Sequence, residues 1–95
     1  MRIEQIILEN RVLENTGLSA KITAAVQKEL RHDTDSITAD GWTFIEEKAP
    51  QLIAVKIATD FDVNEFDSID DRTITDYLSD VIREYEQTHA NIRYH

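Results

Sequence analysis

The most regular hydrophobic pattern of the chain lies in residues 71–85, which read DRTITDYLSDVIREY. Apolar residues recur there three and four positions apart, which places them on one face of an α-helix. Asp70, Asp71 or Thr73 is suited to cap the N-terminus of that helix. The segment therefore predicts an amphipathic helix that docks on a core through one stripe. The stripe consists of Ile74, Tyr77, Leu78, Val81, Ile82 and Tyr85.

A second helix is predicted upstream, where Pro50 begins a run with apolar residues on most sides. Proline has no backbone N–H to donate, but the first turn of a helix leaves such donors without a partner in any case. A helix that is apolar on most sides needs neighbours on several sides, which favours a bundle over a sheet with one helix attached. The residues concerned are Leu52, Ile53, Val55, Ile57, Ala58 and Phe61.

Two further helices are expected toward the N-terminus, over residues 2–15 and 19–31. Thr16-Gly17 supplies a stop between them, and Ser19 is suited to cap the second. The first carries the stripe Ile3, Ile6, Ile7 and Leu13, and the second carries Ile22, Ala25, Val26 and Leu30. Because the first stripe suits either the core or a second copy of the chain, the oligomeric state stays open.

The remaining segments are expected to be connections and a tail. Residues 32–41 predict a polar loop with Ile37 turned inward, and residues 60–71 an acidic connection anchored by Val63, Phe66 and Ile69. From about His89 the tail is expected to fray. The 95 residues are enough for one hydrophobic core and too few for two. We therefore expect a single-domain, all-α bundle of four to five helices over residues 1–95.

Composition excludes several classes of protein. The chain has no Cys, which rules out disulfides, a thiolate zinc site and a thiol nucleophile. No stretch approaches the roughly 20 apolar residues of a membrane span, and acids interrupt the segment where a signal peptide would be continuously apolar. A cytoplasmic protein without a membrane partner is expected.

The net charge of −9 is unevenly distributed. Residues 33–71 hold eleven Asp and Glu against two Lys, whereas residues 1–32 hold four acids and five bases. A negative field of this kind repels phosphate backbones and attracts basic surfaces, and no basic face is evident from the sequence. Direct nucleic-acid binding is therefore not expected, and a basic protein surface is the expected partner.

Motifs for metal binding or catalysis are incomplete. Residues 60–64, DFDVN, match the opening of a calcium-binding loop, but Glu65 and Asp67 replace the Gly and the apolar residue that follow, and Asp71 replaces the final Glu. His32, His89 and His95 have no second ligand at a metal-site spacing. No nucleophile has a base placed to activate it. We expect no enzymatic activity, no metal and no cofactor.

From Ser19 onward the order of features resembles an acyl carrier protein. An amphipathic helix is followed by a long loop, a central helix ending at residues 61–63 and a last helix opening at residues 72–78, which covers about two thirds of the chain. The resemblance implies a four-helix domain with an acidic face toward basic enzyme surfaces. That family attaches 4′-phosphopantetheine to a Ser at the start of the central helix, but residues 41–59 contain no Ser. Ser36, within Asp-Ser-Ile, lies earlier in the chain.

These observations favour a non-catalytic interaction module that docks a basic partner through an acidic face around residues 33–71. One alternative is a DNA mimic, for example phage-encoded, that inhibits a nucleic-acid-binding protein with its carboxylates. Another is a divergent acyl carrier protein that uses Ser36. The candidate partner-binding residues are Asp40, Glu46, Glu47, Asp60, Asp62, Glu65, Asp67, Asp70 and Asp71.

Overall fold

The helix predicted from residues 71–85 forms in the structure as α5 (Asp71–Thr88). Its N-cap is Asp70, whose Oδ1 accepts a hydrogen bond of 2.9 Å from the backbone N–H of Thr73. The fully buried residues of α5 all belong to the predicted stripe, while Tyr77 and Tyr85 at its edges are half-buried. This confirms the stripe as the docking face of the helix.

The computed structural model describes residues 3–32 and 34–94, except for the side chain of Gln5. This part of the chain forms five α-helices and three short helical segments, which confirms the all-α prediction. Arg2, where the first helix was predicted to begin, lies outside the described residues. The other elements are α1 (Ile3–Glu14), α2 (Thr16–Arg31), the 3₁₀ turn η1 (Thr34–Ser36), α3 (Ala39–Thr43), the π-helical turn η2 (Phe44–Lys48), α4 (Ala49–Asp60) and the 3₁₀ helix η3 (Val63–Ser68).

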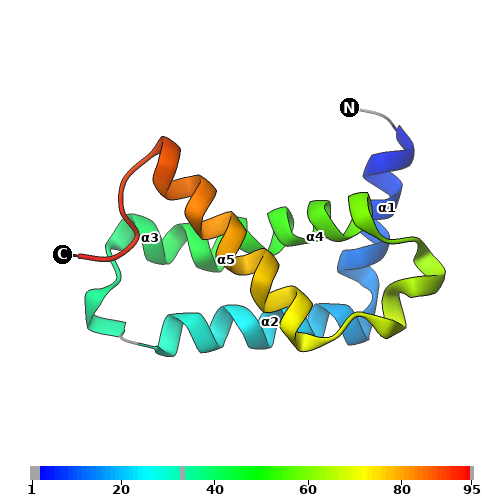
Figure 1. Cartoon of the computed structure of the whole chain (residues 1–95), viewed down its shortest axis with the longest axis horizontal. Coiled ribbons are helices and arrows are strands. Elements are labelled where there is room, and N and C mark those ends of the chain that lie inside the picture. Colours follow the sequence, from blue (N-terminus) through cyan, green and yellow to red (C-terminus); the bar gives the residue numbers. More distant parts are fainter. Residues whose placement is uncertain (1–2, 33, 95) are drawn as a thin grey trace.

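Two long helical segments run along the 41 Å axis of the molecule, α2 on one side and α3–η2–α4 on the other (Figure 1). Helix α5 crosses both obliquely and contacts both, so its buried stripe closes the core between them. Helix α1 packs mainly on α4, at the end of the molecule where η3 also lies. Within the described residues, no helix has the length and apolar composition needed to cross a membrane.

Residues 39–60 form one helical path, because α3, η2 and α4 follow one another without a break. The backbone N–H of Ala49 donates to the carbonyl of Phe44, five residues back, which makes the turn π-helical. Pro50 comes next. In a regular helix its ring would clash with the carbonyl four residues earlier, and the wide turn relieves that clash.

The predicted loop of residues 32–41 is therefore too long. Pro50 lies in the first turn of α4, as predicted, but the helical path already begins at Ala39. Its N-cap is Thr38, whose Oγ1 accepts a hydrogen bond of 3.0 Å from the N–H of Gly41. Ile37 is buried, which confirms its prediction as an inward anchor.

The boundary between α1 and α2 also differs from the prediction. Asn15, not Ser19, caps α2: its Oδ1 accepts a hydrogen bond of 3.0 Å from the N–H of Leu18. Gly17 is thus part of the first turn of α2 and does not stop a helix. The Asn side chain supplies the cap four residues earlier than Ser19 would, which brings the start of α2 forward by about one turn.

Helix α1 packs through the face opposite to the predicted stripe. Val12 is fully buried and Leu8 packs on the core, whereas the residues of the stripe are exposed. Of the two alternatives left open for this stripe, packing on the core is wrong, because the core is closed by the other apolar face of the same helix. The exposed residues are Ile3, Ile6, Ile7 and Leu13.

The C-terminal segment docks on the body of the molecule. Ile92 is fully buried, its carbonyl accepts a hydrogen bond of 2.7 Å from the N–H of Thr38, and Arg93 forms an ion pair with Glu29. The structure thus corrects the expectation of fraying for residues up to 94. The buried side chain of Ile92, the ion pair and an isolated antiparallel β-bridge between Ile37 and Arg93 hold this segment against α3 and the end of α2.

Candidate functional site

The nine candidate acids are all exposed, and the structure divides them into two groups. Asp40, Glu46 and Glu47 lie on α3 and η2, near the C-terminal segment (Figure 1). The other six gather around η3 at the opposite end, and we call them the acidic end. Glu46 and Asp60 are fourteen residues apart on one helical path, which corresponds to about 21 Å. The acidic end consists of Asp60, Asp62, Glu65, Asp67, Asp70 and Asp71.

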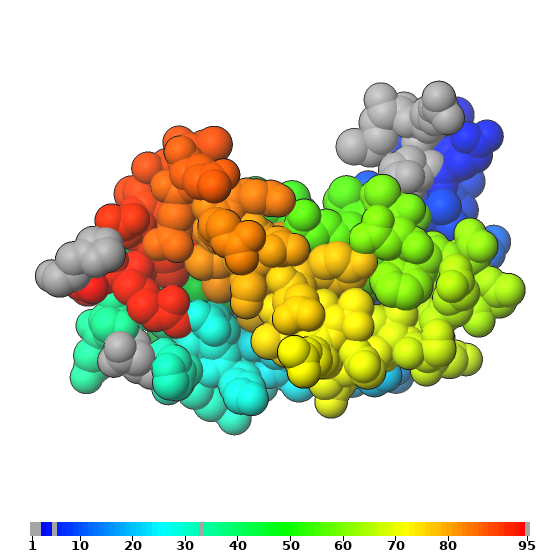
Figure 2. Space-filling view, viewed as in Figure 1, coloured from blue at the N-terminus to red at the C-terminus, as the bar shows by residue number. Residues whose placement is uncertain are grey.

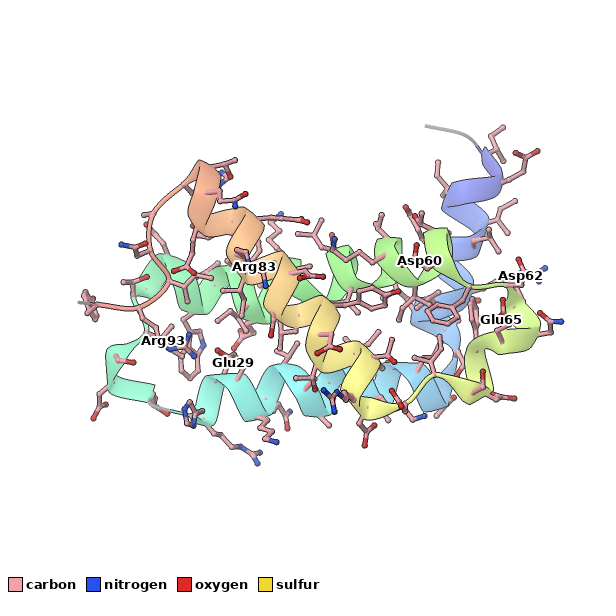
Figure 3. The ribbon with its side chains drawn as sticks, in the orientation of Figure 1. Glu29, Asp60, Asp62, Glu65, Arg83 and Arg93 are labelled. Atoms are coloured by element: carbon pink, nitrogen blue, oxygen red, sulfur yellow. The ribbon has the colours of Figure 1, made fainter. Side chains whose placement is uncertain are left out.

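The backbone of the acidic end is well fixed. Oε1 of Glu65 accepts a hydrogen bond of 2.9 Å from the N–H of Asp62, which caps the start of η3 (Figure 3). Phe66 and Ile69 are buried, which confirms both as anchors. From α2, Nζ of Lys21 donates a hydrogen bond of 2.6 Å to the carbonyl of Ile69. The carboxylates are therefore carried by a segment with little freedom to move.

Val63 is 41% exposed, although the sequence predicts that it points inward. The two buried anchors of η3 occupy the positions that face the core, and Val63 is left at the first residue of that helix, toward solvent. An apolar side chain therefore lies among the carboxylates of the acidic end. Phe61, just before it, is half-buried and packs on the core.

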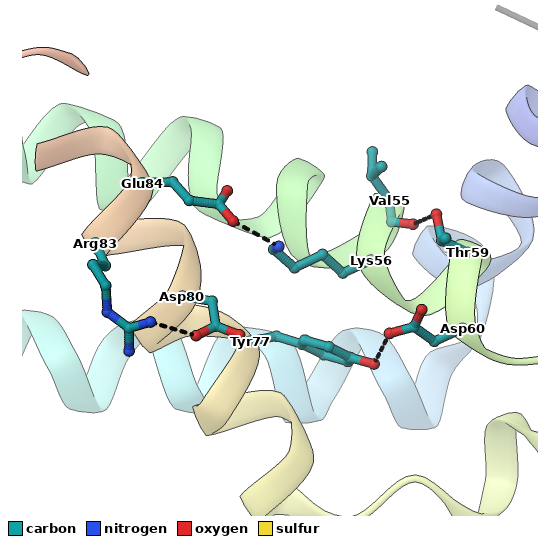
Figure 4. A network of polar contacts seen from close by, with 8 residues as sticks. All are labelled: Val55, Lys56, Thr59, Asp60, Tyr77, Asp80, Arg83 and Glu84. Carbon is teal, nitrogen blue, oxygen red and sulfur yellow. Dashed lines mark hydrogen bonds and ion pairs between the residues drawn. The ribbon is translucent and has the colours of Figure 1, made fainter. Parts of the chain in front are cut away.

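A polar network connects α4 to α5 beside the acidic end (Figure 4). The hydroxyl of Tyr77 donates a hydrogen bond of 2.6 Å to Oδ2 of Asp60. Burial of the ring, followed by this hydrogen bond and the negative charge of Asp60, raises the pKa of Tyr77 to about 12. An ion pair of 3.1 Å between Lys56 and Glu84 links the same two helices.

Asp70 acts in the acidic end as a helix cap. Its Oδ1 accepts hydrogen bonds from the hydroxyl of Thr73 at 2.7 Å and from its N–H at 2.9 Å. These bonds hold the pKa of Asp70 below its ordinary value, because they favour the ionised carboxylate. Asp67 and Asp71, by contrast, make no side-chain hydrogen bond or ion pair with the described residues.

No family model matches this chain, and no curated protein or solved structure is similar enough to it to indicate a relationship.

Sequence reasoning missed a hollow between α2 and α5. It has a volume of about 280 Å³ and adjoins a smaller hollow of about 150 Å³. Lys28 lines both, and Lys21, seven residues earlier on the same face of α2, lines the smaller. Glu29 and Asp71 line them as well, so the surface has mixed charge. The seven-residue spacing of the lysines was the available signal.

The candidates for catalysis or metal binding do not converge. Among the described residues, no three His, Asp or Glu side chains are arranged so that they could hold a metal ion. His89 stacks on Tyr85 with ring centroids 4.6 Å apart, and His32 lies at the end of α2. His95 lies outside the described part. Ser36 is half-buried in η1, where its carbonyl accepts a hydrogen bond of 2.7 Å from the N–H of Tyr94.

Proposed function

We propose that this protein is a non-catalytic interaction module whose acidic end docks a basic surface of a partner protein. The observation that carries the proposal is the charge of one segment: residues 57–71 contain six carboxylates and no Lys or Arg. All six are exposed, and η3 holds them together at one end of the molecule. Their summed field attracts cationic surfaces and repels nucleic acid.

The acidic end also has features expected of a docking surface rather than of a merely solvated loop. Its backbone is fixed by the cap at Glu65 and by two buried anchors, so a partner would meet ordered carboxylates at little entropic cost. Val63 supplies an exposed apolar contact among them. Interfaces commonly combine such an apolar centre with a polar rim.

The two acidic groups offer a matched experiment. Asp67→Asn with Asp71→Asn removes two charges from the acidic end without touching a hydrogen bond of the fold. Asp40→Asn with Glu47→Gln removes two charges from the other group. Both pairs are exposed, so both double variants should fold like the wild type.

Binding is measured by capture of basic proteins on the immobilised chain, followed by titration of a captured protein at low and high salt. We expect affinity to fall about tenfold for the acidic-end variant, little for the control, and steeply with salt for the wild type. Equal losses for both variants would show that only net charge matters. Affinity independent of salt would also contradict the proposal. If the captured protein binds DNA and DNA competes with the chain, the partner surface is a nucleic-acid groove and the mimic alternative gains support.

A further inference from the structure

Helix α1 exposes a regular apolar stripe that nothing in the described part of the chain covers. Ile3 is 76%, Ile6 42% and Leu13 41% exposed. With the exposed Asn10 they follow one another at steps of three, four and three residues. This is the spacing of the a and d positions of a coiled coil, with Ile3 and Asn10 at a and Ile6 and Leu13 at d.

The opposite face of α1 holds the helix in place. Val12 is fully buried and Leu8 packs on the core, and the helix contacts α4 most extensively. A free helix of 12 residues would be marginally stable in water, but this one is ordered by the body of the protein. Its N-terminal end projects beyond α4 (Figure 1, Figure 2). The exposure of Ile3, Ile6 and Leu13 leaves the stripe open to another molecule. A pairing partner would therefore meet a helix that is already formed.

Asn10 indicates what that partner is. Its amide has both donors and acceptors, so a second Asn placed directly opposite satisfies it, whereas an apolar partner residue would leave it unpaired at a cost. A single Asn at an a position is typical of two-stranded parallel pairs, where it fixes the register. A second copy of α1 provides this match by symmetry.

The charge distribution points to the same surface. Two copies with a net charge of −9 repel each other over most of their surface. Residues 1–32, with five bases and four acids, are the part of the sequence where this repulsion is weakest, and within α1 itself it comes from Glu4, Glu9 and Glu14 against Arg11. The exposed Leu52 of α4 shares a hollow with Asn10 and Leu13, which widens the apolar area beside the stripe.

We infer that the protein forms a homodimer in which α1 pairs in parallel with α1 of a second copy, with Asn10 opposite Asn10. This surface is separate from the acidic end, and its test does not depend on the proposed docking function. The dimer would present two acidic ends, so a partner with two basic sites would be bound with increased avidity.

Cysteine cross-linking tests the register in the full-length chain, which has no Cys of its own. Asn10→Cys is compared with Thr23→Cys, an exposed position on α2. We expect Asn10→Cys to form a disulfide-linked species of twice the 11.0 kDa chain mass, about tenfold faster than the control, because pairing concentrates the two thiols. Equal rates for the two variants would overturn the proposal.

Sedimentation equilibrium tests the dimer itself. Ile6→Glu should shift the wild-type dimer to a species of 11.0 kDa with an unchanged circular dichroism spectrum, whereas Tyr94→Glu, also at an exposed apolar position, should stay dimeric. In a parallel pair Glu9 faces Glu14 of the other copy, so Glu14→Lys should tighten the dimer about two- to fivefold by turning repulsion into attraction. A wild-type chain that is monomeric at high micromolar concentration, or a dimer indifferent to Ile6→Glu, would refute the inference.

Discussion

The hydroxyl of Tyr77 and the carboxylate of Asp60 lie 2.6 Å apart, and this hydrogen bond joins the middle of α5 to the last residue of α4. It places one of the six carboxylates of the acidic end in a fixed position. It also couples the ionisation of a tyrosine to the packing of two helices, because the bond exists only while the phenol keeps its proton.

We expect the stability of the fold to decrease between about pH 10 and pH 12. The folded pKa of Tyr77 is raised to about 12, whereas the unfolded value is about 10, so the stabilisation is fully present below pH 10 and is lost as pH rises through the folded value. Urea unfolding across this range measures the decrease. In Tyr77→Phe the decrease should be smaller, and the absorbance change of the last tyrosine to ionise should disappear. An unchanged pH profile for that variant would contradict the coupling.

Asp70→Ala should lower the urea midpoint at pH 7, because α5 then loses its N-cap. The folded pKa of Asp70 is lowered, so its contribution is present above the ordinary value of 3.8 and is lost as pH falls through the folded value. The wild type and the variant should therefore converge in stability as the solution is acidified. Asp71→Ala, at the adjacent exposed position, is the control and should change the midpoint little. A constant difference at all pH values would rule out this role.

The two glycines of the chain should respond oppositely to alanine. A Cβ on Gly41 would lie 2.7 Å from the carbonyl oxygen of Ile92, so Gly41→Ala should push the C-terminal segment away at a cost of about 1–3 kcal/mol. A Cβ on Gly17 finds ordinary space, 3.4 Å from Oδ1 of Asn15, so Gly17→Ala should stabilise α2 by up to about 1 kcal/mol. Thermal unfolding compares the two. Faster hydrogen exchange at the N–H of Thr38 in Gly41→Ala would show that the C-terminal contact is the one lost.

Two neighbours on α4 distinguish core from surface. Ile53 is fully buried, and Ile53→Ala should cost about 2–5 kcal/mol because it leaves a cavity. Leu52 is 42% exposed, and Leu52→Ala should cost less than about 1.5 kcal/mol. Chemical unfolding of the two variants measures the difference. Similar losses would mean that Leu52 contributes to an interface in solution, for instance beside α1, and dilution would then reduce the loss.

Much of the fold follows from local patterns. The stripe of α5 has a single apolar face, so its orientation follows from the sequence, and Asp70 was among its predicted caps. Helix α1 has apolar residues on two faces, and only the shape of the body decides that Val12 is buried and Ile6 is not. Ile92 is fixed by contacts with residues more than fifty positions earlier, which a local pattern does not encode.

The candidate site was predictable where the chain is locally compact. Asp60 to Asp71 stay together because a short 3₁₀ helix connects α4 to α5. Asp40 and Glu46 were expected beside them because residues up to Gly41 were expected to form a loop. The uninterrupted helix from Ala39 to Asp60 instead carries them to the other end of the molecule. The hydrogen bond of Tyr77 to Asp60 depends on how α5 crosses α4, which no spacing along the chain reveals.

The π-helical turn before Pro50 has a geometric effect on the whole path from α3 to α4. Residues Gly41, Ile45, Ala49, Ile53 and Ile57 are buried and recur every four positions. In a regular α-helix such a series drifts around the axis by about 40° per step, or about 160° in all. One extra residue in a wide turn takes up about 100° of that drift. The turn thus resets the phase of the helix, whereas a regular α-helix over the same residues would swing Gly41 away from Ile92.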